Sequence, residues 1–521
     1  MARQYNNYAD IIDFTRASSG TALTKVSYGE ELVTNGTFDT DVSGWYGVSA
    51  GVVSHDSVNN ALKVTANAGD NFAAGETTIS TVVGAVYKLT VDIISFSGVS
   101  VQIGVATTSN GIDISVSNET GSEYSLIFVA QSSTTYVKLG TNDTSGLTHN
   151  AVLDNISLRE VTFGAGALTL FNHPVNVPRV EYDADGNRLG LLVEEARTNL
   201  IASSNQLGSA QRGTVTSGFS DPAGGLDALE FVCSGGSDPI NSITITGSFA
   251  SKTVTFSVWL KLGENPQGYS PNVKLYIYGS GLEGLASEDV TISSNWQRFH
   301  LTTTFSSGFS SSNLTLRFDP FDGVAIAPVE GTSIYFYGRQ LEEGSFPTSY
   351  IPTSGSTATR SADVASIGVS EFGYNSSEGT VFVDWAVAHR PWTGFNRVFE
   401  IGKSGGPNQI SLLGTSGTNN TYPSIVDNSV SQLDYNNTFF TVTTSNFYKV
   451  CMSFKQNDFN LAYNSNLVVG DTLLTVPQID QTNSIFIGSD RNGSSRFTGY
   501  IKSIKYYPRA LTASQLEALT L

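Results

Sequence analysis

The side chains that most often carry enzyme chemistry are sparse in this chain of 521 residues. The five histidines are His55, His149, His173, His300 and His389. No two of them stand at metal-ligand spacing. The carboxylate doublets Glu194–Glu195 and Glu342–Glu343 consist of adjacent residues, which point to opposite faces of a strand. Neither doublet therefore forms the facing pair that glycoside hydrolysis uses. We predict that the chain is not an enzyme, with a glycan hydrolase built from acids on distant strands as the open alternative.

Aromatic residues point instead to binding. Sugar rings stack their C–H faces on tryptophan or tyrosine, and asparagine, aspartate and serine side chains meet the hydroxyls. One face of the strand-like segment KTVTFSVWLKL is wholly apolar: Val254, Phe256, Val258 and Leu260. Trp259 and Lys261 fall on the other, polar face. We predict these two residues as glycan-binding candidates, and packing beneath a loop or a neighbouring chain is the alternative for Trp259.

A second pair of glycan-binding candidates is Trp392 and Arg390, in the loop segment HRPWTGFN. Anchoring of that loop onto a sandwich is the alternative. Trp385 shares a strand face with valines, which predicts a core position. Trp45 and Trp296 are expected to be buried at sheet edges.

Two acidic turns resemble metal sites only in part. The segment EYDADGNRLG places Asp183 in a loop that lacks the distal bidentate glutamate of a calcium loop, so a hairpin turn with Asp-Gly at its tip is predicted. Asp490, in the segment SDRNGSS, is the calcium candidate. No other metal and no cofactor is expected.

Strand-length apolar or alternating runs recur along the chain, among them AVYKLTVDIIS, YSLIFVA, SIYFYGRQL and GTVFVDWAV. Glycine, asparagine, serine and aspartate bound each run, as in antiparallel sandwiches. The predicted fold class is all-β, with tandem antiparallel β-sandwiches of the jelly-roll type and very little helix. One helix is predicted at TASQLEALTL, where Thr512 and Gln515 form a capping box.

The net charge disfavours two classes of partner. The 28 Lys and Arg against 46 Asp and Glu give a net charge of −18, which disfavours nucleic acid and anionic membrane surfaces. No run could span a bilayer, and the N-terminal segment lacks an apolar stretch of signal-peptide length. Cys233 and Cys451 lie in separate apolar runs and are expected to be buried thiols.

Two stretches share one plan, namely an opening segment, a series of strands and a closing strand. We predict that residues 29–161 and 201–353 are jelly-roll sandwiches like carbohydrate-binding modules. Residues 354–521 form a third sandwich that ends in the short helix. The first sandwich interrupts a separate unit, which starts within 1–28 and is completed by 162–200. Such an insertion is cheap because loop-closure entropy grows only logarithmically with length.

The interrupted unit carries specific motifs. DFTRAS at Asp13–Ser18 is continued by Asn176–Tyr182, which contains an Asn-x-Pro-Arg strand, and by GLLVEEARTNL at Gly190–Leu200. These segments resemble a widespread module of tailed-bacteriophage virion proteins, and Ser349–Ile367 resembles the linker that follows the sandwich in such proteins. The C-terminal FTGYIKSIKYYPRALTASQLEALTL resembles the last strands and helix of laminin-G or concanavalin-like lectin domains.

The resemblance implies a virion protein of structure and adhesion, such as a tail fibre, spike or head fibre that binds host surface polysaccharide. It implies contacts with other virion proteins and a homo-oligomer, with a trimer favoured because multivalency strengthens weak glycan contacts. The subunit is expected to be made in the host cytoplasm without a signal peptide, and 1–28 to include a virion-attachment segment. A virion-associated polysaccharide depolymerase and a purely architectural decoration protein are the alternatives.

Overall fold

The computed structural model describes residues 13–234, 239–264, 272–320, 330–388, 394–415, 420–433, 440–444, 446–468 and 475–521. Strands account for 55% of the chain and helices for 3%. The sheets are antiparallel, so the predicted all-β class is confirmed. Within the described ranges, no helix is long and apolar enough to cross a membrane.

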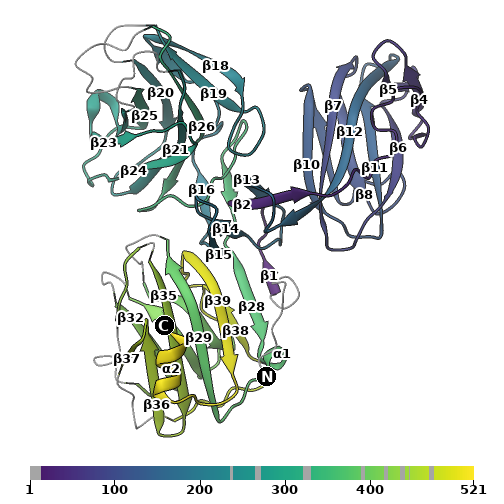
Figure 1. Cartoon of the computed structure of the whole chain (residues 1–521). Coiled ribbons are helices and arrows are strands. Elements are labelled where there is room, and N and C mark those ends of the chain that lie inside the picture. The colour runs from purple at the N-terminus through teal and green to yellow at the C-terminus, as the bar shows by residue number, and fades with distance from the viewer. Residues whose placement is uncertain are drawn as a thin grey trace. The chain divides into compact units, whose positions relative to one another are not determined.

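The chain divides into two compact units, drawn in Figure 1. Lys25–Leu168 is one unit, and Met1–Thr24 with Thr169–Leu521 is the other. The boundary falls within strands β2 (Gly20–Tyr28) and β13 (Ala167–His173). In chain order, the unit Lys25–Leu168 therefore stands between the two parts of the other unit.

Lys25–Leu168, here called the inserted sandwich, is built on two sheets. One sheet has the order β10-β7-β12-β2-β13, with β5 beside β12 and β4 beside β5, and the other has the order β3-β6-β11-β8-β9. Their bounds are β3 (Tyr46–Val48), β4 (Val52–Asp56), β5 (Ala61–Ala66), β6 (Phe72–Ser80), β7 (Val86–Phe96), β8 (Ser100–Ala106), β9 (Ser115–Glu119), β10 (Glu123–Val129), β11 (Thr134–Asn142) and β12 (His149–Phe163). Alternate residues of β7 and β11, such as Leu89, Val91 and Leu139, fill the core and are 0% exposed.

The second sandwich follows in the other unit. Its two five-stranded sheets have the orders β18-β19-β26-β21-β24 and β17-β20-β25-β22-β23. The bounds are β17 (Ser209–Gln211), β18 (Gly213–Phe219), β19 (Ala228–Cys233), β20 (Ile240–Thr246), β21 (Thr253–Leu262), β22 (Asn272–Tyr278), a 3₁₀ turn (Ser280–Leu282), β23 (Ala286–Thr291), β24 (Gln297–Thr304), β25 (Asn313–Pro320) and β26 (Ser333–Glu343). Phe256, Leu275 and Phe336 lie in the core between the sheets.

The C-terminal sandwich has one sheet in the order β14-β15-β39-β29-β35-β36-β37 and another in the order β1-β28-β38-β30-β31-β32-β33, with β34 beside β32. The bounds are β1 (Asp13–Thr15), β14 (Val180–Tyr182), β15 (Arg188–Val193), β28 (Val364–Gly368), α1 (Val369–Phe372), β29 (Glu378–Val387), β30 (Asn396–Gly402), β31 (Gln409–Gly414), β32 (Asn420–Asp427), β33 (Val430–Ser431), β34 (Phe440–Thr441), β35 (Phe447–Lys455), β36 (Asp458–Tyr463), β37 (Asn466–Val468), β38 (Ser484–Ile487), β39 (Gly499–Tyr507) and α2 (Ala513–Leu519). Trp385 is 0% exposed in this core, as predicted.

The strands of the interrupted unit join the sheets of the C-terminal sandwich. β1 pairs with β28, where Phe14 stands opposite Ala365, and β15 pairs with β39, where Leu192 stands opposite Tyr500. A further two-stranded pair joins β16 (Arg197–Asn199) to β27 (Ala358–Arg360). The alternation in this segment identifies the strands but not their partners, so the sequence did not indicate this pairing.

The predicted C-terminal helix and the buried thiols are confirmed. The Thr512 hydroxyl accepts a hydrogen bond from the Gln515 N–H, and the Gln515 side chain accepts one from the Thr512 N–H. Leu516 packs with Cys451 on the sheet beneath the helix. Cys233 and Cys451 are both buried and free.

The separation of 201–353 from 354–521 as independent domains stays a prediction. The segment 1–12, which holds most of the expected virion-attachment residues, lies outside the described residues.

Candidate functional site

Strand β21 places Trp259 and Lys261 on one surface of the second sandwich. The alternate residues face the core and are 0% exposed: Val254, Phe256, Val258 and Leu260. Trp259 and Lys261 are half-buried on the outer face of the sheet β18-β19-β26-β21-β24. The strand geometry is as the alternation predicts, while the role of the two residues in binding stays a prediction.

Aromatic residues from neighbouring strands extend this surface. The Lys261 Nζ lies 5.9 Å from the ring centroid of Trp296 and 5.6 Å from that of Tyr335. The Phe219 and Tyr335 ring centroids are 5.2 Å apart. An ammonium group over aromatic faces is held by cation–π attraction. We call Phe219, Trp259, Lys261, Trp296 and Tyr335, together with Glu230, the aromatic face.

Glu230 adds a carboxylate to the aromatic face. It stands opposite Tyr335 in the β19–β26 register and accepts hydrogen bonds from the Ser333 Oγ, at 2.8 Å, and from the Tyr335 hydroxyl. Burial raises the pKa of Tyr335, and the nearby charge of Glu230 raises it further. The phenol therefore stays protonated at neutral pH and acts as a donor.

One side of the aromatic face is closed by the segment that follows β26. The Tyr350 ring packs edge-on against Tyr337 with centroids 5.3 Å apart, and Phe219, Trp259 and Trp296 pack against the cluster that contains this pair. Gly338 permits the approach, because its φ is +64° and a Cβ atom there would lie 3.1 Å from the Tyr350 ring. The Trp259 Nε1 is buried and has no hydrogen-bond partner among the described residues. Trp259 is thus partly a packing residue and partly a surface residue.

Beyond Trp259 the same sheet face is polar, and the segment around Thr348 covers it. Arg298 donates to the Thr348 carbonyl at 2.6 Å and to the Ser257 Oγ at 2.9 Å. Glu342 accepts from the Thr348 N–H at 2.9 Å and from its hydroxyl at 2.5 Å. These bonds fix the segment that carries Tyr350, and so they fix one border of the aromatic face.

A group of buried charges lies elsewhere in the same unit. Arg179 forms ion pairs with Glu194 at 2.8 Å and Asp363 at 2.5 Å, Arg16 pairs with Asp363 at 3.2 Å, and Arg360 pairs with Glu194 at 3.4 Å. All five side chains are at most 4% exposed. We call them the junction cluster. Because every member is enclosed by protein, the cluster is suited to holding segments together rather than to reaction with a substrate.

The junction cluster joins the segments whose motifs stand out in the sequence. Arg16 comes from DFTRAS, Arg179 from the Asn-x-Pro-Arg strand and Glu194 from GLLVEEARTNL, while Arg360 and Asp363 come from the linker. Glu194 also accepts hydrogen bonds from the Ser349 N–H at 2.8 Å and the Ser349 hydroxyl at 2.7 Å. The linker segment next to Tyr350 is therefore tied to the cluster.

Burial shifts three pKa values around the junction cluster. Burial raises the pKa of Glu194, but Arg360, Arg179 and the Ser349 hydrogen bonds outweigh it and lower the pKa to about 2. Burial, with the charges of Arg179 and Arg16, lowers the pKa of His173 to about 3. Burial and the charge of Glu194 raise the pKa of Glu181 to about 7.

The two glutamate doublets point to opposite faces, as predicted. Glu194 is buried in the junction cluster while Glu195 is half-exposed, and Glu342 is buried against Thr348 while Glu343 is exposed and paired with Lys252. Neither doublet forms a facing carboxylate pair. Among the described residues there is no group of three or more histidine, cysteine, aspartate or glutamate side chains that could hold a metal ion.

Asp490, the calcium candidate, closes its own turn. One carboxylate oxygen accepts from the N–H groups of Asn492 and Ser494, at 3.1 and 2.8 Å, and the other accepts from the Ser494 hydroxyl at 2.7 Å. Asp183 closes the β14–β15 turn in the same manner, which is the predicted hairpin. Calcium binding at Asp490 stays a prediction.

The other tryptophans divide into three outcomes. Trp45 is 6% exposed, as expected. Trp296 is half-buried beside Lys261, so the expectation that it is buried at a sheet edge is wrong. It precedes β24 by one residue. Phe299 packs toward the core, so by strand alternation Arg298 and Trp296 both face outward. The candidates Trp392 and Arg390 lie outside the described residues, in 389–393.

Tyr335, Phe219 and Glu230 were not among the residues predicted from the sequence to bind glycan. The alternation in SIYFYGRQL carries the signal for Tyr335, since Ile334 and Phe336 both face the core. Alternation likewise places Glu230 outward between buried Leu229 and Phe231. No sequence pattern brings Phe219 to Tyr335, because that contact depends on how the strands pair.

Comparison with known proteins gives a family match for one part of the chain. Residues 363–517 match a family model described as the concanavalin A-like lectin/glucanases superfamily. No curated protein matches the chain.

Several solved structures are similar over about a third of the chain or less. Domain 4 of AbnA, a GH43 extracellular arabinanase from Geobacillus stearothermophilus in complex with arabinotriose, is 17% identical, with 34% of this chain and 84% of that chain covered and a TM-score of 0.26. The CBM40 of a Ruminococcus gnavus IT-sialidase bound to α2,3-sialyllactose is 13% identical, with 28% and 83% covered and a TM-score of 0.22. A heptameric SAP-like pentraxin from Limulus polyphemus is 15% identical, with 28% and 70% covered and a TM-score of 0.23. What the comparisons identify is a concanavalin A-like region at 363–517, within the C-terminal sandwich.

Proposed function

We propose that the chain is a carbohydrate-binding protein and that its aromatic face binds polysaccharide. The observation that carries this proposal is the row Phe219, Tyr335, Lys261 and Trp296, in which three rings and an ammonium group share one partly exposed sheet face. Ring faces stack on the C–H faces of sugars, and the ammonium group and the carboxylate of Glu230 can exchange hydrogen bonds with hydroxyls. The description of the family that matches 363–517 names lectins and glucanases, which supports a glycan as the ligand class.

Substitutions on the aromatic face test the proposal. The purified full-length chain is screened on a glycan array and then titrated with the polysaccharide that binds best. We expect Trp259→Ala and Trp296→Ala each to weaken binding at least tenfold, corresponding to a loss of ~1.4 kcal/mol. Both tryptophans also pack against the cluster that contains Tyr337 and Tyr350, so each variant is first shown to be folded by circular dichroism.

The opposite sheet of the same sandwich provides a matched control. There the Arg317 guanidinium lies 4.9 Å from the ring centroid of Tyr276, so a cation again covers an aromatic ring. Tyr276→Ala is expected to leave binding unchanged. Equal loss of binding in Tyr276→Ala and Trp296→Ala, or unchanged binding in both, would contradict the assignment to the aromatic face.

We further propose that the chain is a phage virion subunit that adheres to host surface polysaccharide. The support is the set of phage-like motifs that meet in the junction cluster, together with tandem sandwiches and an acidic surface. Phage particles labelled with antibody against the chain are expected to show it on the tail or the head. Absence of label from intact and opened particles would refute the virion role.

Light scattering of the purified chain tests the expected trimer, and a monomer at micromolar concentration would refute it.

A further inference from the structure

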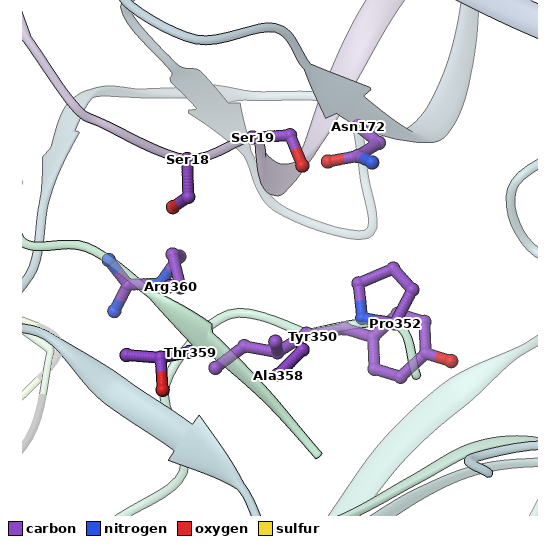
Figure 2. A pocket seen from close by; sticks show the side chains of 9 residues that line it. Ser18, Ser19, Asn172, Tyr350, Pro352, Ala358, Thr359 and Arg360 are labelled. Carbon is purple, nitrogen blue, oxygen red and sulfur yellow. The ribbon is translucent and has the colours of Figure 1, made fainter. Parts of the chain in front are cut away.

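A cavity of about 140 Å³ lies between the turn after DFTRAS, strand β13 and the linker. Figure 2 shows Ser18, Ser19 and Asn172 along one side, and Pro352, Thr359 and Arg360 on the other. Ser19, Pro352 and Thr359 are exposed, whereas Arg360 is buried, so the cavity opens to solvent. At ~30 Å³ per liquid water, it has room for about four or five water molecules.

Two polar atoms of the lining residues lack partners. The Asn172 Oδ1 and the Arg360 Nε are buried, and neither has a hydrogen-bond partner in the described part of the chain. Buried polar atoms without partners are uncommon in folded proteins, because each leaves its loss of hydration uncompensated. Figure 2 shows the Asn172 oxygen and the Ser19 hydroxyl pointing toward each other at the rim. A guest that donates hydrogen bonds would satisfy the Asn172 oxygen.

The charge of Arg360 is already taken up by the protein. Its Nη2 donates to the Glu195 carbonyl at 2.6 Å, its Nη1 donates to the Ser361 carbonyl at 3.1 Å, and its guanidinium pairs with Glu194 at 3.4 Å. The cavity therefore presents hydroxyls and an amide oxygen rather than a free charge. The Pro352 ring adds an apolar surface across from them. A polar rim facing an apolar wall is complementary to a ring that has hydroxyls at its edge and C–H groups on its face.

We propose that this cavity binds one neutral, hydroxyl-bearing ring, such as a terminal sugar residue. Asn172 accepts a hydroxyl hydrogen bond, Ser18 and Ser19 bond further hydroxyls, and Pro352 contacts the C–H face. The site is separate from the aromatic face, and the proposal does not rest on the proposed function.

Saturation-transfer NMR on the full-length chain tests the site, with the methyl glycosides of glucose, galactose and mannose and with glycerol as probes. At least one probe is expected to bind saturably. Asn172→Leu, which removes the acceptor while keeping a side chain of similar shape, should weaken that binding at least tenfold, and Ser19→Val at the exposed rim should weaken it about threefold. Tyr276→Ala is the control that should leave it unchanged. Circular dichroism and the unfolding midpoint establish that each variant is folded. If Asn172→Leu does not fold, the result with Ser19→Val decides whether the cavity binds the probe.

Three results would overturn the proposal. Saturable binding by none of the four probes would mean that the cavity holds water only. Binding that is unchanged in both the Asn172 and the Ser19 variants would place the probe elsewhere. Binding that is lost in Trp296→Ala but kept in the cavity variants would assign it to the aromatic face, which overturns this inference and supports the proposed function.

Discussion

The outer sheet faces around β21 in the second sandwich and around β6 in the inserted sandwich carry similar side chains in different surroundings. Around β6, the Lys138 Nζ lies 5.3 Å from the Phe72 ring centroid, and the Tyr46 hydroxyl donates to Glu76 at 2.9 Å. Around β21, Lys261 likewise lies over aromatic rings, and a tyrosine hydroxyl likewise meets a glutamate. The two faces thus share an ammonium group over a ring and a carboxylate bound by a phenol.

The two faces differ because a loop that contains Ser109 and Asn110 covers the face around β6. Glu76 also accepts from the Ser109 hydroxyl at 2.7 Å and the Asn110 N–H at 2.6 Å, and Lys138 donates to the Asn110 carbonyl at 3.1 Å. Glu76 is 0% exposed and Lys138 is 4% exposed, whereas Glu230 and Lys261 are half-buried. The inserted sandwich satisfies these groups with its own chain. The comparison teaches that access to the face, and not the kinds of side chain on it, distinguishes a candidate binding face from a structural one.

Acid should destabilise the sandwich that carries the aromatic face more than the inserted sandwich. The reason is that only the aromatic face is bordered by a segment tied to the junction cluster. Glu194 has a pKa of about 2 against an ordinary 4.5, so its stabilisation is present above pH 4.5 and is lost as the pH falls toward 2. His173, at about 3 against 6.5, favours unfolding progressively below pH 6.5. Glu181, raised from 4.5 to about 7, acts in the opposite direction between pH 7 and 4.5 and offsets His173 there. At ~1.4 kcal/mol per pKa unit, we expect a loss on the order of 5 kcal/mol below pH 4.5.

Urea unfolding at pH 7, 4.5 and 3 measures this loss, with tryptophan fluorescence and limited proteolysis to assign each transition to a unit. The unit containing Thr169–Leu521 is expected to change little between pH 7 and 4.5 and then to weaken steeply. The unit Lys25–Leu168 lacks the junction cluster and should retain more of its stability at pH 3. A steep loss between pH 7 and 5 in the first unit, or equal losses in both units, would contradict the account.

Removal of the carboxylate should affect the closed face more than the open one. Glu76→Ala leaves Lys138 buried without its charge partner and removes three hydrogen bonds, so the unfolding free energy of the inserted sandwich should fall by about 3 kcal/mol. Glu230→Ala in the half-buried setting should cost the second sandwich about 1 kcal/mol. Denaturant titration of both variants measures the two values. Similar costs would mean that the faces do not differ in the way their surroundings indicate.

The smallest expected effect concerns Lys261. A cation–π contact at an exposed site is worth about 0.5–1 kcal/mol, so Lys261→Gln should weaken polysaccharide binding roughly two- to fivefold. Lys88, whose Nζ lies 5.5 Å from the Tyr28 ring centroid in the inserted sandwich, offers a matched control. Lys88→Gln should leave binding unchanged in the same titration. A larger effect for Lys88→Gln than for Lys261→Gln would place the polysaccharide on the other unit.

Much of the fold was predictable because alternation determines which residues of a strand are buried. The faces of β21, the core position of Trp385 and the capped helix α2 all follow from local patterns of side chains. Pairing between distant strands was not predictable, since β15 could add to any sheet with an open edge. Its pairing with β39 joins residues about 300 positions apart in the sequence.

The candidate site was predictable in part for the same reason. Alternation placed Trp259 and Lys261 on one face, but the approach of Phe219 and Tyr335 depends on strand order. The junction cluster could not be predicted from the sequence, because its arginines and acids become partners only when distant segments fold together. Its members appeared in the sequence as isolated charges within recognisable motifs.

The most direct measurement is a crystal structure of the full-length chain with an oligosaccharide of the best-binding polysaccharide. We expect sugar rings stacked on Trp296 and Tyr335, with hydroxyls near the Lys261 ammonium group and the Glu230 carboxylate, and no sugar on the face around Glu76. Sugar bound on the face around Glu76, or an aromatic face left empty while the oligosaccharide occupies another site, would contradict the central claim.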